Sequence, residues 1–382
     1  MLELDERWRA LTTELEQVRS EQNAASRSLR GAPTPEQREQ LAQLSARGRE
    51  LSDRETAIRA ELDTVLSSLP NLPSDEAPDQ DTVLRAVGEP RSGGRDHLEL
   101  AGPRIDMERG ARLSGSRFAY LRGDLVLLEL ALVRYAMEKL MAEGFEPVIP
   151  PVLVREQALY GTGMWPDTEQ QIYTLPTDDL FLVGTSEVAL ASMHRDEILP
   201  AADLPLRYAG FSSCFRREAG AAGKDTRGIF RVHQFDKVEM FSFVEPDAAG
   251  EEHLRLLAIE ESIMHDLEIP YRVVAIAVDD LGSSAASKFD VEAWLPGQGR
   301  YRELTSTSNT TDFQARRLDI RYRPAEGRPA HLATLNGTAA AVGRTIIALL
   351  ENGQREDGSV ELPAVLTGFG APAVLPAAPG LT

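Results

Sequence analysis

The sequence predicts an α+β fold, with a largely antiparallel sheet and flanking helices, preceded by an antiparallel helical hairpin. In residues 1–69, apolar side chains recur at alternating spacings of four and three, as they do along the seam of a coiled coil. From about residue 120 onward, amphipathic helical stretches mix with several strand-like runs that no regular helix separates. This arrangement favours an antiparallel sheet over a doubly wound parallel sheet.

The hairpin is predicted as a coiled-coil arm over residues 1–69. Its two apolar series lie in residues 4–29 and 41–69, and Gly48 and Glu55 are the imperfect positions of the second series. The turn between the two series is too short for anything other than an antiparallel pair. Two helices are therefore expected to pack along one seam.

The start of the second helix carries a clear capping signal. Thr34 can cap the helix, Pro35 suits its first position, and Gln37 completes a capping box. The sequence therefore predicts a helix over residues 35–69, which would extend about 50 Å at 1.5 Å per residue.

Charge is distributed unevenly along the arm. Residues 17–49 carry six arginines against three glutamates, a net charge of +3, whereas residues 1–16 and 50–69 each carry −3. A solvated coiled coil gives this pattern, and so does a positively charged finger that binds a polyanion. The distal arginines are Arg19, Arg27, Arg30, Arg38, Arg47 and Arg49.

Two further segments are defined by composition. Residues 70–96 are rich in Pro, Gly and Asp and predict a linker or crossover that leads into a mixed domain over residues 97–382. Residues 367–382 are rich in small residues and proline, which predicts a poorly ordered tail.

Composition excludes several classes of protein. The 382 residues carry a formal net charge of −19, which argues against a protein that coats nucleic acid non-specifically. The single cysteine, Cys214, excludes an internal disulfide framework and a Cys-rich zinc site. The N-terminus is acidic, unlike a signal peptide, and no apolar run approaches the roughly 18 residues that span a bilayer. We expect a cytoplasmic protein without membrane contact, zinc or an organic cofactor.

The most informative stretch lies within residues 207–243. Alternation over residues 230–240 predicts a strand, and residues 211–215 predict its partner across a glycine-rich loop at residues 219–228. An ordinary sheet with one solvated face is the simpler interpretation. A cleft for a planar, anionic ligand explains more, because guanidinium groups bind phosphate, an aromatic face stacks on a base and a carboxylate binds an amine. The residues expected to face this cleft are Arg231, His233, Phe235, Lys237 and Glu239.

Two other clusters fit a site of this kind. Thr185 and Glu187 share parity, so in an extended backbone their side chains face the same way. Glu303 lies close to the hydroxyls of Thr305 and Ser306, a set of oxygen donors suited to Mg²⁺, although an acid at a strand end in water gives the same pattern. Neither a P-loop nor a Gly-x-Gly-x-x-Gly fingerprint is present, so a nucleotide would have to bind in another way.

Together these segments resemble a class II aminoacyl-tRNA synthetase, and specifically the bacterial type of the seryl-tRNA synthetase family. The family's three motifs resemble residues 144–151, 215–239 and 336–345, and residues 185–187 and 313–317 point to the seryl branch. The resemblance covers essentially the whole chain. It implies the class II antiparallel sheet, a homodimer formed through the first motif, and an arm that grips the long variable arm of tRNA(Ser) through the distal arginines.

The resemblance also implies the reaction and its residues. L-serine would be activated by ATP with Mg²⁺ to seryl-adenylate, and the seryl group would pass to the 3′ end of tRNA(Ser) and also of tRNA(Sec). Arg216, Arg344 and Glu303 would be catalytic, with Phe235 stacked on the adenine and Arg344 on its other face. ATP would contact Arg216, Arg217, Glu218, Arg231, Val232, Phe235, Glu303, Leu304, Thr305, Ser306 and Arg344. Serine would contact Thr185, Ser186, Glu187, Arg216, Glu239, Asn336 and Thr338, and Mg²⁺ would bind Glu303 and Ser306.

The sequence departs from the family pattern in three places. Arg217 stands where Ser is common, and alanines fill residues 339–341 where Gly-Leu-Ala is frequent. Family members usually carry a few dozen residues before the arm. Either the start codon of this sequence is misplaced or the chain is a shortened form, in which case we expect weaker tRNA binding. Two alternatives stay open: a serine-activating paralogue that serves a biosynthetic pathway or another acyl acceptor, and a non-catalytic tRNA-binding homologue.

Overall fold

The structure is a computed structural model, and it describes residues 1–29, 31, 33–167, 170–219, 223, 225 and 227–379. The chain forms two compact units, Met1–Leu69 and Pro70–Thr382. Two residues singled out in the sequence, Arg30 of the arm and Lys224 of the glycine-rich loop, lie outside the described residues.

The first unit is the predicted helical pair, formed by α1 (Leu2–Ser28) and α2 (Pro35–Ser67). The capping box is confirmed, because the Thr34 hydroxyl accepts from the backbone N–H of Gln37 and the Gln37 side chain accepts from that of Thr34. The buried seam consists of apolar residues from both predicted series, namely Leu11, Leu15, Val18, Leu51, Ile58 and Leu62.

Both imperfect positions of the second series have a structural explanation. Glu55 accepts a hydrogen bond of 2.6 Å from the indole N–H of Trp8, which gives a polar partner to an aromatic side chain on the seam. A Cβ on Gly48 would lie 3.8 Å from Cγ1 of Val18, so the small residue sits opposite a buried valine of α1. The seam therefore continues through both positions.

The second unit is organised around one large sheet, which has eight strands within the described residues, in the order β1-β11-β12-β13-β16-β10-β9-β4. All neighbouring pairs are antiparallel except β4 with β9, so the predicted antiparallel sheet is confirmed. In that order, the strands are Thr82–Val87, Tyr271–Ala275, Ser287–Leu295, Arg300–Asn309, Ala333–Ala341, Gln234–Val244, Leu206–Phe215 and Glu146–Val148.

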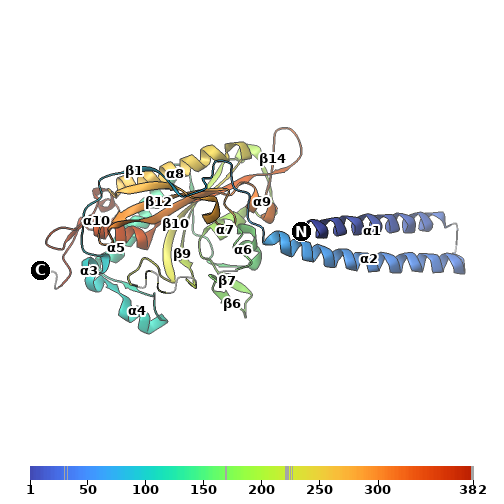
Figure 1. Cartoon of the computed structure of the whole chain (residues 1–382), viewed down its shortest axis with the longest axis horizontal. Coiled ribbons are helices and arrows are strands. Elements are labelled where there is room, and N and C mark those ends of the chain that lie inside the picture. Colours follow the sequence, from blue (N-terminus) through green and yellow to red (C-terminus); the bar gives the residue numbers. More distant parts are fainter. Residues whose placement is uncertain are drawn as a thin grey trace. The chain divides into compact units, whose positions relative to one another are not determined.

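Three long helices contact this sheet, as Figure 1 shows: α5 (Asp124–Ala142), α8 (Ala249–Asp266) and α10 (Val342–Asn352). Their apolar faces share one hydrophobic core with inward-facing strand residues such as Val238 and Met240. The shorter helices are α3 (His97–Ala101), α4 (Met107–Ser114), α6 (Glu156–Thr162), α7 (Glu187–Ala191), α9 (Phe313–Leu318) and α11 (Ala364–Thr367).

Smaller sheets complete this unit. Two of them have two strands each: β2 (Ile105–Asp106) pairs with β3 (Tyr120–Leu121), and β17 (Val360–Glu361) pairs with β18 (Val374–Leu375). In a three-stranded sheet, β7 (Leu180–Leu182) lies between β5 (Leu153–Val154) and β6 (Thr174–Leu175). In another, β14 (Arg321–Arg323) lies between β8 (Ile198–Pro200) and β15 (Ala330–His331). No helix in the described part of the chain has the length and apolar character needed to cross a bilayer.

Two expectations from composition need correction. The segment at residues 70–96 contains β1, which pairs with β11 at the edge of the large sheet. The described part of the tail, residues 367–379, packs against the rest of the second unit, because β18 pairs with β17 and Ala371, Leu375 and Ala378 are buried. In the tail, small apolar side chains fill space in the core, which composition alone does not reveal.

Two β-bulges shape the sheet where the predicted site residues lie. On β10 and β16 the pairing shifts between Val238 and Glu239, which leaves Ala339 unpaired. On β12 and β13 it shifts between Val291 and Glu292, which leaves Leu304 unpaired. A bulge adds one residue to a strand and re-aims the side chains beyond it.

Candidate active site

A cavity of about 240 Å³ lies among β10, β13, β16 and the start of α10. Each residue predicted to bind ATP lines it except Arg217, whose side chain is exposed. The lining residues are Arg216, Glu218, Ile229, Phe230, Arg231, Val232, Phe235, Lys237, Glu303, Leu304, Thr305, Ser306, Thr338, Ala341, Gly343 and Arg344. The structure therefore gathers residues from the second and third predicted motifs and from the Glu303 cluster, whereas no residue of the first motif lines the cavity.

The β-bulge at Leu304 explains how Glu303 and Ser306 reach the same cavity. Residues three apart on a regular strand point to opposite faces. The extra residue in β13 restores a common direction, and both side chains line the cavity.

The residues just before β10 do not form the strand that was predicted for them. The strand begins at Gln234, and residues 228–233 form a series of bends, so the predicted alternation holds from residue 234 and fails before it. The cavity is consequently lined by three successive residues, Phe230, Arg231 and Val232. In a regular strand, successive side chains would point to opposite faces of the sheet.

Arg216 is held at the end of β9 (Leu206–Phe215). Its Nε donates to the carbonyl oxygen of Gly184 at 3.1 Å, and its Cζ lies 5.4 Å from the ring centre of Phe235. The His233 ring contacts the carbonyl oxygen of Arg216 through Nδ1 at 2.9 Å, so this histidine supports the backbone of the site. The guanidinium group is thus fixed beside an aromatic face.

Arg344 occupies the other side of the cavity. Its Nη1 donates to the carbonyl oxygen of Glu303 at 3.0 Å and lies 3.3 Å from the carboxylate Oε2 of the same residue. The guanidinium group stacks on Phe230, with Cζ 4.7 Å from the ring centre. In the structure, Phe235 therefore faces Arg216 and Phe230 faces Arg344.

Glu303 remains a carboxylate in this setting. Burial opposes its ionisation, but Arg344, Lys288 and Arg216 together hold the pKa of its carboxyl group below the ordinary value. An ionised oxygen donor is thus available between cationic groups.

Arg231 lies at the cavity wall between two acids. Its Nη1 donates to Glu218 at 3.0 Å and its Nε to Asp225 at 3.3 Å, while Arg302 also binds Asp225 at 2.7 Å. These ion pairs tie the segment after β9 to β13.

The residues predicted to bind serine form a buried network next to this cavity. Lys237 of β10 donates to the Thr185 hydroxyl at 2.8 Å, and that hydroxyl donates to Glu239 at 2.9 Å. Lys237 also forms an ion pair with Glu239. The backbone N–H of Glu187 donates to the Thr185 oxygen at 3.2 Å. Thr185 and Glu187 lie at the start of α7 and not on a strand, yet they meet as predicted.

Glu187 is held by two amide side chains. Its Oε1 accepts from Gln314 at 2.7 Å and from Asn336 at 3.0 Å, and Thr334 donates to Gln314 at 2.9 Å. Burial and the charge of Glu239 raise the pKa of Glu187 to about 7, against the opposing effects of Lys237, Gln314 and Arg216. This carboxyl group therefore titrates near neutral pH.

Several predicted residues do not present their side chains to the cavity. The Ser186 hydroxyl is fully buried and faces Gly210 of β9, where a Cβ would approach its Oγ to 3.1 Å. The Thr305 hydroxyl donates to Glu260 of α8 at 3.0 Å. Leu304 is 1% exposed. At these positions only the backbone is available to a ligand.

The arginines predicted to contact tRNA are exposed along α1 and α2, apart from Arg30, which falls outside the described residues. Arg47 forms an ion pair of 2.8 Å with Glu14, whereas Arg38 donates to the carbonyl oxygen of Pro33 and Arg49 to Ser45. No ion pair of Arg19, Arg27, Arg38 or Arg49 is found among the described residues. Arg47 is thus partly neutralised, and the other four keep their charge available.

Comparison with known proteins decides the family. A family model for the seryl-tRNA synthetase N-terminal domain matches residues 1–73, and one for the class II tRNA synthetase core domain (G, H, P, S and T) matches residues 173–353. A serine–tRNA ligase of Thermobifida fusca is 53% identical over 381 residues, with 97% of this chain and 90% of the relative covered. The chain belongs to the seryl-tRNA synthetase family.

Further relatives support the same family assignment. A serine–tRNA ligase of Nocardia farcinica is 51% identical, with 97% of this chain and 90% of the relative covered. The crystal structure of seryl-tRNA synthetase from Pyrococcus horikoshii complexed with ATP matches with a TM-score of 0.92 and 40% identity, with 98% of this chain and 92% of that chain covered. This enzyme is accordingly a ligase that activates serine with ATP and charges tRNA.

The residues of this seryl-tRNA synthetase fit a magnesium ion. Glu303 and Ser306 offer a carboxylate and a hydroxyl oxygen, the hard donors that Mg²⁺ prefers. Asp290 of β12 pairs with Ser306 across the ladder, and its Oδ1 forms an ion pair of 2.9 Å with Lys288. No group of three or more His, Cys, Asp or Glu side chains within the described part of the chain is arranged to hold a metal, so phosphate oxygens would have to complete such a site.

Three residues of the site were not among the residues predicted to bind ATP, serine or Mg²⁺. Lys237 links the cavity to the serine network, Gln314 orients Glu187, and Glu260 accepts from Thr305. Lys237 stands in the predicted row of cleft-facing residues, which was a usable signal. Gln314 lies in the segment that identified the seryl branch, whereas Glu260 lies mid-helix with no local signal.

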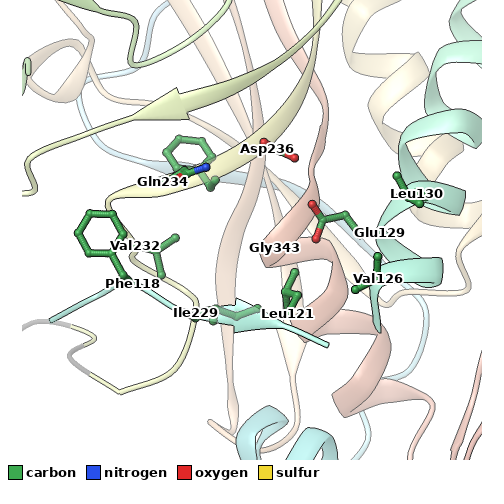
Figure 2. Close-up of a pocket in the computed structure, with 12 residues that line it drawn as sticks. Phe118, Leu121, Val126, Glu129, Leu130, Ile229, Val232, Gln234, Asp236 and Gly343 are labelled. Atoms are coloured by element: carbon green, nitrogen blue, oxygen red, sulfur yellow. The ribbon is translucent and has the colours of Figure 1, made fainter. Parts of the chain in front are cut away.

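A second hollow of about 310 Å³ adjoins the cavity and shares Ile229, Val232, Phe235 and Gly343 with it. Figure 2 shows the carboxylate of Glu129 from α5 directed toward Asp236 of β10 across this hollow. Burial and Asp236 raise the pKa of Glu129 to about 7.

Proposed function

We propose that ATP binds at the Arg216–Arg344 end of the cavity and L-serine at the Thr185–Glu239 end, so that seryl-adenylate forms between them. The observation that best supports this proposal is that the cavity and the serine network are directly connected. Lys237 and Thr338 line the cavity, and Lys237 is bonded to Thr185 and Glu239. Cations suited to phosphate and carboxylates suited to an ammonium group therefore share one site.

At the ATP end, Arg216 binds the α-phosphate and Glu218 the adenine side. Phe235 offers the adenine an aromatic face, and Arg344 leaves Phe230 to cover the other face of the base and reach the γ-phosphate. Val232, Arg231 and the backbone of Leu304 and Thr305 complete the wall. When bound at Glu303 and Ser306, Mg²⁺ supplies charge neutralisation on the phosphates.

At the serine end, Glu239 and Glu187 bind the ammonium group and the hydroxyl, with Thr185, Asn336 and Thr338 around them and Ser186 contributing its backbone. A site that hydrogen-bonds the hydroxyl leaves polar groups unpaired when alanine binds, which discriminates against alanine. The side chain of Arg217 takes no part.

The chemistry needs no protein nucleophile. A serine carboxylate oxygen attacks the α-phosphorus, and the bond from that phosphorus to pyrophosphate breaks. The 3′-terminal hydroxyl of tRNA(Ser), or of tRNA(Sec), then attacks the carbonyl carbon and releases AMP and a proton. Arg216 and Arg344 supply positioning and charge neutralisation, which account for most of the acceleration.

The arm holds the long variable arm of the tRNA through Arg19, Arg27, Arg38 and Arg49, with Arg47 and Arg30 as further contacts. We place the reaction in the cytoplasm, where tRNA and ATP are available together. The enzyme works as a homodimer. Apolar side chains exposed on and after α5 support this, among them Leu127, Leu130, Met141 and Ile149.

Substitution of Arg344 tests the catalytic assignment. Arg344→Ala should lower serine-dependent pyrophosphate exchange by about 10²- to 10³-fold, the usual effect of losing one group that stabilises transition-state charge. Arg355→Ala is the matched control, because Arg355 pairs with Glu361 outside the cavity. Exchange at the wild-type level in Arg344→Ala would contradict the assignment of Arg344, whereas a wild-type protein without any exchange would favour a tRNA-binding protein without catalysis.

A further inference from the structure

Strands β13 and β16, which both contribute residues to the cavity, stop pairing with each other next to it. Within the described residues, β13 pairs with β16 at Thr307, Ser308 and Asn309 and not beyond. The next positions toward the cavity are Ser306 and then Thr305 on β13, and Thr338 on β16. Beyond this point, backbone pairing does not fix the spacing of the two strands.

Glu260 of α8 bridges the strands where their pairing stops. Its side chain is fully buried, at 0% exposure. The Thr305 hydroxyl donates to its Oε2 at 3.0 Å, and on the β16 side the backbone of Thr338 approaches the same carboxyl group and lowers its pKa. Its Oε1 has no partner among the described residues and faces Gly337, where a Cβ would approach it to 3.0 Å.

The surroundings of Glu260 favour a neutral acid. The charged groups that act on it most are Asp290 and Glu239, both acidic, and no cation pairs with it in the described part of the chain. Burial raises the pKa of Glu260 well above its ordinary value, and the bonds from Thr305 and Thr338 oppose this only in part. A buried unpaired charge would be costly, so this site favours the protonated form of Glu260 over the ionised form.

The contacts of Glu260 are expected to affect serine binding more than ATP binding. Thr338 is paired with Glu239 across the ladder, so a shift of β16 moves the wall of the serine pocket. Arg216, Phe235 and Arg344, the main ATP contacts, lie on other segments and do not touch Glu260.

We propose that Glu260 is a positioning residue whose hydrogen bonding, and not its charge, holds β13 and β16 at the spacing that serine binding requires. The proposal rests on the proposed function, because it needs serine bound beside Thr338. Glu260 touches neither substrate, and it acts through Thr305 and Thr338.

Four variants separate this role from a merely structural one. Glu260→Gln keeps the size and neutral hydrogen bonding of the side chain, whereas Glu260→Met keeps the size alone. Thr305→Val removes the same bond from the other side. Ile263→Ala is the control, since it removes buried volume from the same helix.

Serine-dependent pyrophosphate exchange gives the decisive readout, with thermal denaturation measured alongside. We expect Glu260→Met and Thr305→Val each to raise the KM for serine about 10-fold and the KM for ATP less than about twofold. Glu260→Gln should stay within about twofold of wild type for both substrates. The double variant Glu260→Met/Thr305→Val should be no worse than Glu260→Met alone, because both changes remove one interaction. Ile263→Ala should lower Tm and leave the KM for serine unchanged.

Two results would overturn the proposal. If Glu260→Gln is as defective as Glu260→Met, the ionised form is the one required. If Glu260→Met lowers Tm and leaves the KM for serine unchanged, as Ile263→Ala does, the role is structural only. Should Glu260→Met fail to fold, Thr305→Val and Glu260→Gln decide the outcome. A wild-type enzyme without serine-dependent exchange would instead contradict the proposed function.

Discussion

At the scale of single residues, Glu187 connects the serine pocket to pH. Its carboxyl group is buried beside Glu239, and its pKa is raised to about 7. In the free enzyme it is therefore protonated below pH 7 and ionised above it. An ammonium group binds the ionised form, so serine binding at lower pH must first release this proton.

The KM for serine should consequently rise as pH falls below 7, approaching about tenfold per pH unit, and should level off above pH 7. Pyrophosphate exchange measured between pH 6 and 8 at saturating ATP checks this. Glu187→Gln is the control, since it should raise the KM at every pH and remove the dependence. A wild-type KM for serine that does not change over this range would exclude Glu187 as the ammonium ligand.

The sequence could predict which residue types form the site, but not always which atoms face it. Ten of the eleven residues predicted to bind ATP line one cavity, six of them from the family's motifs and four from the Glu303 cluster. Ser186 and Thr305 turn their hydroxyls away, and Glu260 is joined to Thr305 across 45 residues. Such side-chain directions depend on contacts between distant segments, which local patterns do not record.

At the scale of secondary structure, the arm was the most predictable element. Periodicity and a capping box are local signals, and both helices end within two residues of the predicted bounds. The bulges at Leu304 and Ala339 were not predictable, because a bulge breaks the alternation on which strand prediction depends. Strand β1 was missed because its side chains are all exposed, so its pairing with β11 leaves no alternating apolar pattern.

The exposed arginines of the arm allow a matched test of tRNA binding. The triple substitution Arg19→Ala, Arg27→Ala and Arg38→Ala should weaken tRNA binding and flatten its salt dependence by about one unit of log–log slope per lost phosphate contact. Arg47→Ala should do less, because Glu14 already pairs with that guanidinium group.

If the triple variant binds tRNA as tightly as the wild type and with the same salt dependence, this surface of the arm is not the tRNA-binding surface. Serine-dependent exchange without tRNA should stay at the wild-type level, since these residues lie in the other compact unit. A fall in that exchange would show that the arginines act on the catalytic unit instead.

At the scale of the whole molecule, the two units divide the work. Residues 70–382 hold the cavity, whose residues suit the chemistry of activation. In the other unit, residues 17–49 carry a net charge of +3 on a chain whose net charge is −19. The local charge of the arm favours a polyanion that the acidic remainder would repel. Activation and tRNA recognition are therefore expected to be separable by substitution.

Charging of total tRNA with labelled serine, ATP and Mg²⁺ tests this account most directly, with labelled threonine and alanine as controls. We expect serine alone to be attached to tRNA, and we expect Arg344→Ala to abolish the attachment. Formation of seryl-adenylate without any charging of tRNA would contradict the account and point to a different acyl acceptor.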